Sequence, residues 1–370
     1  MSLEASSSGF GALLAVLVMA LVLVPDAVTR LRPSPASLLN ATLPALAILM
    51  PTGASAFALL GLAAFALWWQ ARAVTTRGAR MLGMAALGQL TVAVVMLVQP
   101  GGAAILFGSL FVLALRAGCC GLHGGVSALY RAAPALQVQQ FVTLLAHVYV
   151  HLRYVDHLPA AFAAAPAVVM LGAASALVFA LIALVARSLD GMLRASMLMH
   201  GGLLLAATGA AGRGHQAAAL FVVLSMVLAL AGFSMCVLAL EARVGKVSLL
   251  HAGGRARAFP RLASAFGFFG AAGVGMPGTA GFIADDLVLH ALWAESVSAT
   301  VAVTVATALL AIATLRTITQ TFMGPSTPSI APDLGANERA IALALILLLL
   351  AIGLVPQLVI GAAAELFVGR

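Results

Sequence analysis

Charged residues are scarce in this sequence: Asp, Glu, Lys and Arg make up only 8% of its 370 residues. A soluble domain usually carries about 25%, so the composition excludes an ordinary soluble protein. Acidic residues are the scarcest, with 11 Asp and Glu against 19 Lys and Arg, and Lys246 is the single lysine. In an apolar chain such a basic excess is typical of cytoplasmic loops. Because no DNA- or RNA-binding motif accompanies it, no nucleic-acid partner is expected.

Cysteines are also few. Cys119 and Cys120 are adjacent, which makes a disulfide between them unfavourable, and Cys236 lies in an apolar run. None has the spacing of a metal site, so all three are interpreted as small buried hydrophobic residues. The sequence also lacks a phosphate-binding loop, a nucleophile motif and haem-ligand spacing. No metal, cofactor or catalytic residue is therefore expected in this chain.

Long apolar runs dominate what is present, since 63% of the residues are hydrophobic and the mean hydropathy is +1.13. The runs are long and unbroken, without the short alternating segments of a barrel, so we expect an all-α polytopic membrane protein. We expect 12 transmembrane helices. Their ranges are 10–28, 37–50, 54–73, 81–99, 103–121, 136–152, 163–187, 190–211, 215–241, 258–290, 297–322 and 338–365.

The basic residues support this number of crossings because they fall almost entirely on one side. That side receives Arg30, Arg32, Arg72, Arg77, Arg80, Arg131, Arg187, Arg194, Arg243, Lys246, Arg255, Arg257, Arg261 and Arg316. The other side receives little beyond Arg153, Arg213 and Arg370. The positive-inside rule makes the first side cytoplasmic, with both termini outside.

Two glycine-rich segments break the apolar pattern. The tenth span contains Gly275, Pro277 and Gly278, directly before two carboxylates, and a proline removes a backbone donor and clashes with the preceding turn. A similar segment, 118–125, follows the fifth span. The breaks lie five helices apart, and an odd offset indicates two inverted five-helix repeats. We therefore expect repeats at 37–152 and 163–322, an N-terminal helix and loop at 1–36 and a C-terminal helix at 323–370.

Few ionisable residues lie within the spans, and each is a candidate for an ion path. The candidates are Arg116, His147, His151, His200, Asp285, Asp286 and His290. His147, His151 and Tyr154 share one helical face, as do Asp286 and His290. Structural roles stay open: Arg116 as a snorkelling side chain, His200 as an interhelical hydrogen-bond partner, and Asp190 with Arg194 as an interfacial ion pair.

Residues 275–282 resemble a hallmark of the antiporter-like membrane subunits. This family includes the proton-translocating subunits of respiratory complex I (NADH:quinone oxidoreductase), of membrane hydrogenases and of Mrp-type antiporters, and the membrane subunit of inorganic-carbon uptake pumps. Further motifs that are similar to the family's are Asp190 and Arg194 followed by residues 200–202, residues 321–325, Glu338–Arg339 and residues 353–356. The resemblance extends from about Arg116 to the C-terminus and implies a shortened member in the bacterial inner membrane.

The resemblance implies a polar axis along the membrane midplane, in which lysines pass protons toward a Lys or Glu after the second break. Arg116 and His147 stand at two of the lysine positions, His200 keeps the family identity, and Asp285 replaces the terminal residue. Ser225 and Ala229 fall where some members have His and Lys.

The chain also departs from the family's pattern. Arginine cannot release its proton in a protein, and the family's glutamate is missing from the span 54–73. We therefore expect a degenerate first half-channel, in which Arg116 faces water, a lipid head group or another subunit. The path through His147, His200 and Asp285 is expected to conduct.

Three functions remain open at this stage. The first is a proton-conducting subunit that couples ion translocation to a larger respiratory or uptake complex. The second is a scaffold that anchors a peripheral catalytic partner, and the third is a stand-alone cation/proton antiporter. The expected partners are other membrane and peripheral subunits, H⁺ or Na⁺, and the lipid bilayer.

Overall fold

The computed structural model describes the whole chain except residues 1, 29–33, 100–101, 212–214, 327–330 and 362–370. Arg30, Arg32, Arg213, Arg370 and the end of the last expected span lie outside the described residues. Within the described part the elements are all helices. They are α1 (Ser2–Val28), α2 (Pro35–Leu49), α3 (Gly53–Ala71), α4 (Thr76–Val98), α5 (Ala103–Ala117), α6 (His123–Ala132), α7 (Pro134–Tyr154), α8 (Pro159–Leu184), α9 (Leu189–Ala211), α10 (Gln216–Val244), α11 (Pro260–Ala272), α12 (Ala280–Glu295), α13 (Val297–Phe322) and α14 (Ala336–Leu354).

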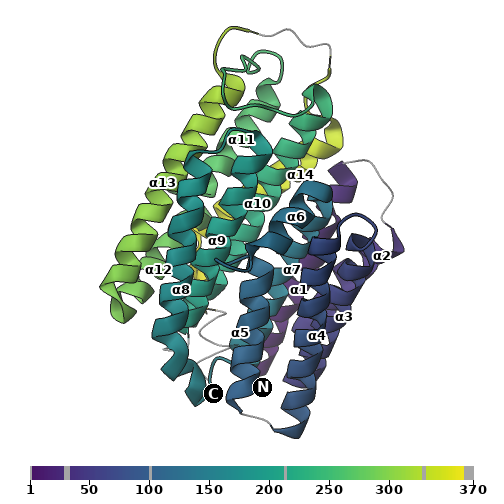
Figure 1. The fold of residues 1–370 in the computed structure, drawn as a ribbon, viewed down its shortest axis with the longest axis vertical. Coiled ribbons are helices and arrows are strands. Elements are labelled where there is room, and N and C mark those ends of the chain that lie inside the picture. Colours follow the sequence, from purple (N-terminus) through teal and green to yellow (C-terminus); the bar gives the residue numbers. More distant parts are fainter. Residues whose placement is uncertain (1, 29–33, 100–101, 212–214, 327–330, 362–370) are drawn as a thin grey trace.

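The long helices lie side by side and run along the long axis of the molecule (Figure 1). Among the described residues, six helices are long and apolar enough to cross a membrane: α3, α4, α8, α10, α13 and α14. Shorter apolar helices lie at Gly9–Val24, Pro35–Leu49 and Ala103–Ala117. The all-α, multi-pass architecture expected from the sequence is confirmed.

The glycine-rich segments of the fifth and tenth expected spans each separate two helices. The tenth is broken between α11 and α12, as its Gly-Pro-Gly sequence predicts. The fifth was expected to end at the glycine-rich segment, but the chain continues as α6 beyond it, so this expectation was wrong. Gly118 ends α5 in the left-handed conformation, with φ of 76°, and the helix resumes at His123. A broken helix therefore stands fourth in each of the ranges 37–152 and 163–322, whose division into repeats stays a prediction.

The loop residues 245–259, 323–326 and 331–335 lie at the upper end of the bundle in Figure 1. Arg243 at the end of α10 joins Glu338 of α14 there, with Nη1–Oε1 and Nη2–Oε2 distances of 3.1 and 2.6 Å. Such a bidentate pair adds geometric specificity to its energy, so it fixes α14 against α10. We call the upper end of the bundle, where these loops lie, the basic end. Its cytoplasmic orientation stays a prediction.

Helices α8 and α9 approach each other through small residues. A Cβ added to Gly202 of α9 would lie 2.5 Å from the backbone nitrogen of Ala176 in α8, and one added to Gly172 would overlap the backbone of Ala206. Small residues four positions apart on both helices allow close backbone contact, which drives helix association in lipid. This contact holds α9, and with it His200, in a fixed position.

We expect Gly202→Ala to destabilise the protein by about 1–3 kcal/mol, because overpacking forces the two backbones apart. Thermal unfolding in mild detergent would measure the loss. Gly267→Ala is the matched control, since Gly267 is also helical and nothing lies within 4 Å of the added Cβ. Equal unfolding temperatures for the two variants would contradict the close contact of α8 and α9.

Candidate functional site

The break between α11 and α12 brings two backbone ends and an acidic side chain together. Gly275 and Gly278 have φ of 78° and 86°, a conformation that only glycine adopts readily. The amide of Met276 donates to the carbonyl of Ala271 at 3.0 Å, and the hydroxyl of Thr279 donates to that of Met276 at 2.7 Å. Part of the broken backbone is therefore satisfied within the protein, as lipid requires.

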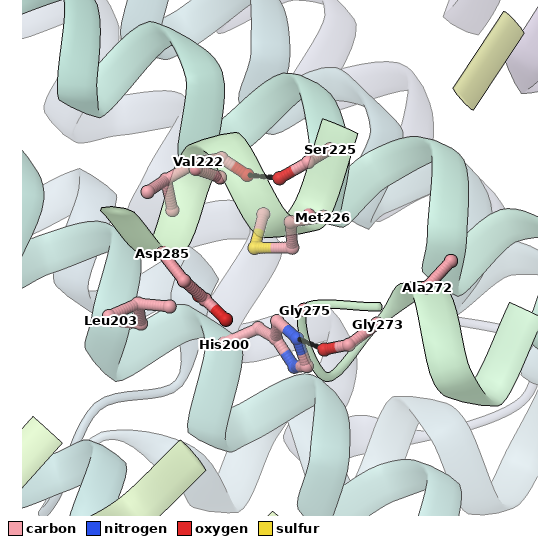
Figure 2. A pocket seen from close by; sticks show the side chains of 11 residues that line it. His200, Leu203, Val222, Ser225, Met226, Ala272, Gly273, Gly275 and Asp285 are labelled. Carbon is pink, nitrogen blue, oxygen red and sulfur yellow. Dashed lines mark hydrogen bonds between the residues drawn. The ribbon is translucent and has the colours of Figure 1, made fainter. Parts of the chain in front are cut away.

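A small cavity of about 10 Å³ lies beside this break, with room for roughly one water molecule. The side chains of His200, Ser225 and Asp285 line it, from α9, α10 and α12 respectively. The carboxylate of Asp285 points toward the side of the cavity where His200 and Gly275 lie (Figure 2). Three helices that are distant in the sequence therefore place an acid, an imidazole and a hydroxyl around one space.

His200 is held between two carbonyl oxygens. Its Nδ1 lies 2.8 Å from the carbonyl of Ser196, and its Nε2 lies 2.8 Å from the carbonyl of Gly273 at the break. A neutral imidazole carries only one N–H, whereas an imidazolium donates from both nitrogens. The site therefore offers two acceptors to a protonated ring, and one of them belongs to the broken helix.

Gly275 determines where the Asp285 carboxylate sits. A Cβ added at Gly275 would overlap Oδ2 of Asp285, whereas one added at Gly278 meets nothing within 4 Å. The absence of a side chain at Gly275 thus leaves the space that the carboxylate occupies. The sequence predicted the helix break, and the structure adds that the break and the acid fit against each other.

A second polar cluster lies in the first half of the chain, around Arg116 and His147. Oε1 of Gln89 accepts from Nη1 of Arg116 and from Nδ1 of His147, both at 3.3 Å, while its Nε2 donates to the carbonyl of Leu60 at 2.8 Å. The hydroxyl of Ser109 lies 3.3 Å from Nε2 of His147 and 2.8 Å from Nδ1 of His151. These side chains form one continuous hydrogen-bonded chain from Arg116 to His151.

Arg116 is buried, with 1% of its surface exposed. Its Nη2 donates to the hydroxyl of Thr143 and, at 3.2 Å, to the carbonyl of Gln140. The expectation that Arg116 faces water, a lipid head group or another subunit is therefore wrong for this chain. Neutral dipoles from α4 and α7 surround the guanidinium in place of a carboxylate, which is how the chain tolerates the missing glutamate.

The shared face of His147 and His151 is confirmed, because both rings contact Ser109. Tyr154 is not part of this hydrogen-bonded chain, since its hydroxyl donates to the carbonyl of Met50 at the end of α2 at 2.5 Å.

Asp156 follows in the loop between α7 and α8 and is 4% exposed. Burial raises its pKa to about 7, and a hydrogen bond from Gln216 at 2.9 Å opposes that rise. The polar chain on α7 thus runs toward a buried carboxyl group at the end opposite the basic one.

Asp286 and His290 lie outside both clusters. Their side chains are 59% and 79% exposed on the outer surface of α12, 3.5 Å apart.

Asp190 and Arg194 pair at 3.8 Å on the first turns of α9, each 23% exposed. That geometry fits the interfacial ion pair considered from the sequence. Among the described residues, no group of three or more His, Cys, Asp and Glu side chains could hold a metal ion.

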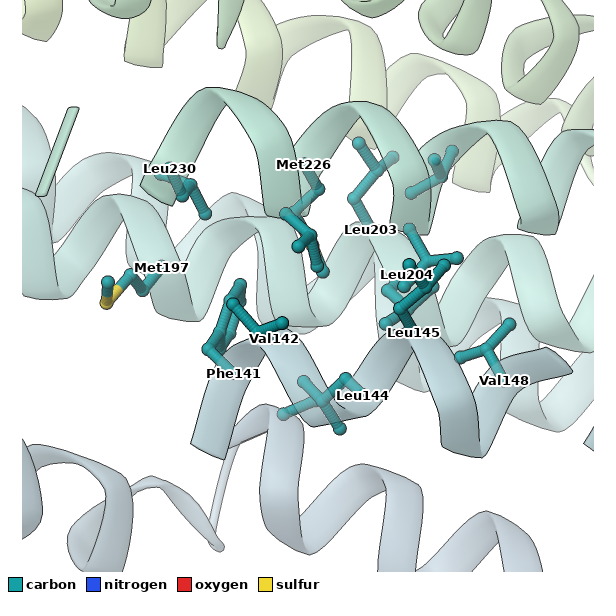
Figure 3. Packing of buried hydrophobic residues seen from close by; sticks show 14 of the residues in the cluster. Phe141, Val142, Leu144, Leu145, Val148, Met197, Leu203, Leu204, Met226 and Leu230 are labelled. Carbon is teal, nitrogen blue, oxygen red and sulfur yellow. The ribbon is translucent and has the colours of Figure 1, made fainter. Parts of the chain in front are cut away.

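Apolar side chains fill the space where α7, α9 and α10 meet. Phe141 and Leu145 of α7, Leu204 of α9 and Met226 and Leu230 of α10 belong to this packed region (Figure 3). His147 bonds toward α4 and α5, whereas His200 bonds toward α11. No hydrogen bond in the described part of the chain joins the two clusters, so they form two separate polar sites.

Several residues in these sites were not singled out from the sequence. They are Gln89, Ser109, Gln140, Thr143 and Asp156. Gln89 and Ser109 each stand within a largely apolar span, which is the signal that could have drawn attention to them. Neutral polar side chains are ordinary partners between membrane helices, so the signal is weak.

We expect Gly275→Ala to displace the Asp285 carboxylate, because the new methyl group occupies its place. Reaction of Asp285 with a hydrophobic carbodiimide, followed by mass spectrometry, would detect the change in its surroundings. Gly278→Ala is the control, since it has the same left-handed strain, about 1–2 kcal/mol, without the overlap. Equal labelling of Asp285 in both variants would contradict the role assigned to Gly275.

The sequence model of the family described as "NADH:quinone oxidoreductase/Mrp antiporter, TM" matches residues 15–311. No curated protein matches. Solved structures share the fold at low sequence identity. A chain of the Mrp complex from Dietzia sp. DQ12-45-1b has a TM-score of 0.79 and 20% identity, covering 96% of this chain and 83% of that one.

Two other structures share the same fold. A chain of respiratory complex I from Thermus thermophilus gives a TM-score of 0.83 at 20% identity, with 97% and 84% of the two chains covered. A chain of the membrane-bound sulfane sulfur reductase, an archaeal respiratory membrane complex, gives 0.74 at 19% identity, with 96% and 82% covered. The family match spans most of the chain and agrees with the broken-helix fold. This protein belongs to the NADH:quinone oxidoreductase/Mrp antiporter transmembrane family, the antiporter-like membrane subunits.

Proposed function

We propose that this chain is a proton-conducting, antiporter-like membrane subunit that couples ion translocation to a larger respiratory or uptake complex. The observation that carries the proposal is the cavity beside the second helix break, where His200 and Asp285 face one water-sized space. An ionisable residue inside a membrane bundle is costly and marks ion pathways. A base, His200, and an acid, Asp285, around one cavity suit proton exchange.

The chemistry of the cavity supports this role. The two carbonyl oxygens at 2.8 Å stabilise His200 when both of its ring nitrogens carry protons. One water molecule in the cavity would hydrogen-bond the Asp285 carboxylate, and it reaches the imidazole when one ring nitrogen leaves its carbonyl partner. Imidazole and carboxyl groups are the usual carriers of a proton near neutral pH, and the hydroxyl of Ser225 lies on the same cavity wall.

The first polar cluster plays a different part in this proposal. A proton can pass between His151, Ser109 and His147, because each can both donate and accept. The chain then reaches the amide oxygen of Gln89 and the guanidinium of Arg116, which do not relay protons. His147 therefore ends a short chain, and the proton-handling site of this proposal is the cavity of His200 and Asp285.

A scaffold without conduction is the second candidate, and one observation favours it. The apolar packing between α7, α9 and α10 separates the two clusters (Figure 3), and a proton cannot cross dry hydrocarbon. Conduction along the whole axis requires water to enter this region. A chain in which that never happens would instead anchor a peripheral partner, for example in an inorganic-carbon uptake complex.

The complexes that contain structurally similar chains support a hetero-oligomeric partnership. The Mrp complex, complex I and the sulfane sulfur reductase are membrane complexes, and we infer membrane and peripheral partners for this chain. The basic end then faces the cytoplasm of a bacterial inner membrane, with both termini outside. H⁺ or Na⁺ is the transported ion.

We expect Asp285→Asn to lower proton flux at least tenfold, since removing a positioned proton carrier typically costs about 10² or more in rate. The measurement is the quenching of a pH-sensitive dye in inverted membrane vesicles. Asp286→Asn is the matched variant: the neighbouring residue undergoes the same change, but its side chain is 59% exposed. We expect its flux to be unchanged.

Two outcomes would contradict the assignment. If both variants translocate protons at the original rate, the flux does not pass through the cavity and the assignment of Asp285 is wrong. If Asp286→Asn alone loses flux, the path follows the outer surface of α12, and the sequence prediction for Asp286 and His290 replaces the cavity.

We expect other subunits to co-purify with this chain from native membranes in mild detergent. Mass spectrometry of the purified material would identify them. Iron–sulfur or quinone-reactive subunits would assign it to a respiratory complex, whereas one large soluble subunit would assign it to an uptake complex. Purification of the chain alone, with intact flux, would contradict the coupling role and favour a stand-alone antiporter.

A further inference from the structure

A groove of about 560 Å³ lies at the basic end, between α4 and the break that separates α5 from α6. Arg77 and Arg80 line it, in the first turns of α4, and Met81 and Met84 line it further along the same helix face. At 1.5 Å per residue, Met84 lies about 6 Å deeper than Arg80. Leu115 completes the apolar wall, so the groove has a cationic rim and an apolar floor.

A second groove of about 540 Å³ lies between α11 and α14 at the same end. Arg261 and Arg339 line its rim, and Phe268 and Ile346 lie seven residues further along the two helices. A separation of seven residues places them on the same helix faces, about 10 Å deeper. Each broken helix thus has beside it a groove with two arginines above an apolar wall.

The four arginines have no acidic partners in the described part of the chain. Asp333, the acid beside the second groove, accepts from the backbone amides of Arg261 and Leu262 at 2.8 and 3.2 Å. Glu338 is bound to Arg243. Arg339 has only a weak contact to the carbonyl of Gly335, at 3.4 Å. All four side chains are exposed.

Helix stability does not account for these arginines. Arg77 and Arg261 are the second residues of α4 and α11, where the helix dipole disfavours a positive charge. An anion at the rim would neutralise two arginines at once, and the apolar wall below it suits a hydrocarbon chain. Each groove therefore suits an amphiphile whose negative head group lies at the rim and whose apolar tail runs along the wall.

We propose that the two grooves bind anionic phospholipids of the leaflet at the basic end. In each groove the lipid phosphate lies between the two arginines, and one acyl chain packs along the apolar wall. This inference goes beyond the proton path, because none of the groove residues belongs to either polar cluster. A lipid in the first groove also covers the break next to Arg116.

Native mass spectrometry of the full-length protein, with any co-purifying subunits, tests the proposal. The probes are phosphatidylglycerol as the anionic lipid, phosphatidylethanolamine as the neutral lipid, and inorganic phosphate. The variants are Arg77→Gln with Arg80→Gln, and Arg261→Gln with Arg339→Gln. Arg187→Gln with Arg257→Gln is the control, since both are exposed arginines of the basic end and line neither groove.

We expect each groove variant to bind phosphatidylglycerol at least tenfold more weakly, consistent with about 1 kcal/mol for each arginine near a lipid surface. Binding of phosphatidylethanolamine should be weak and equal in all proteins, and the control should retain phosphatidylglycerol. An unchanged thermal unfolding temperature would show that the variants remain folded. All substitutions are at exposed side chains, so we expect this result.

Three results would overturn the proposal. Equal binding of both lipids would show that the grooves are not selective for charge. Displacement of phosphatidylglycerol by millimolar inorganic phosphate would identify a site for free anions. Cross-links from Met84→Cys or Phe268→Cys to a co-purifying subunit, with no lipid retained, would show that a partner helix fills the grooves.

Discussion

Every polar group inside this bundle must find its partner within the protein, because the surrounding lipid offers none. The partners that the structure supplies are dipoles more than ionic groups. Carbonyl oxygens hold His200, and an amide, a hydroxyl and a carbonyl hold Arg116. The helix breaks supply part of these dipoles, since the carbonyl of Gly273 is free to accept only where α11 ends. The breaks therefore provide hydrogen-bond acceptors for ionisable side chains in an apolar interior.

The fold was largely predictable because membrane helices are long, apolar and bounded by charge. The exception is α6, which begins inside the glycine-rich segment and is short and partly polar. Arg131 lies in its last turn, so neither length nor hydropathy distinguishes this helix from a loop. What defines it is the packing of Tyr130 and Val126 into the core, a tertiary contact that a single sequence does not show.

The candidate site was predictable only in part, and the reason is chemical. Ionisable residues are rare in membrane spans, so His147, His200 and Asp285 were visible in the sequence. Their partners are glutamine, serine, threonine and backbone groups, which are common in such spans. The partners also come from distant helices: Gln89 meets residues 116 and 147. The wrong prediction for Arg116 followed from considering carboxylates as its only possible partners.

The neutral surroundings of Arg116 have a consequence for coupling between the two halves. A carboxylate beside a cation can gain or lose a proton, which changes the net charge of the pair and the field that it exerts. Gln89 and Thr143 cannot do so. The charge at Arg116 is therefore constant, and this position cannot report proton movement to the second half. A proton signal within this chain must begin at a group that titrates, and Asp285 and His200, which share one cavity at the second break, meet that condition together.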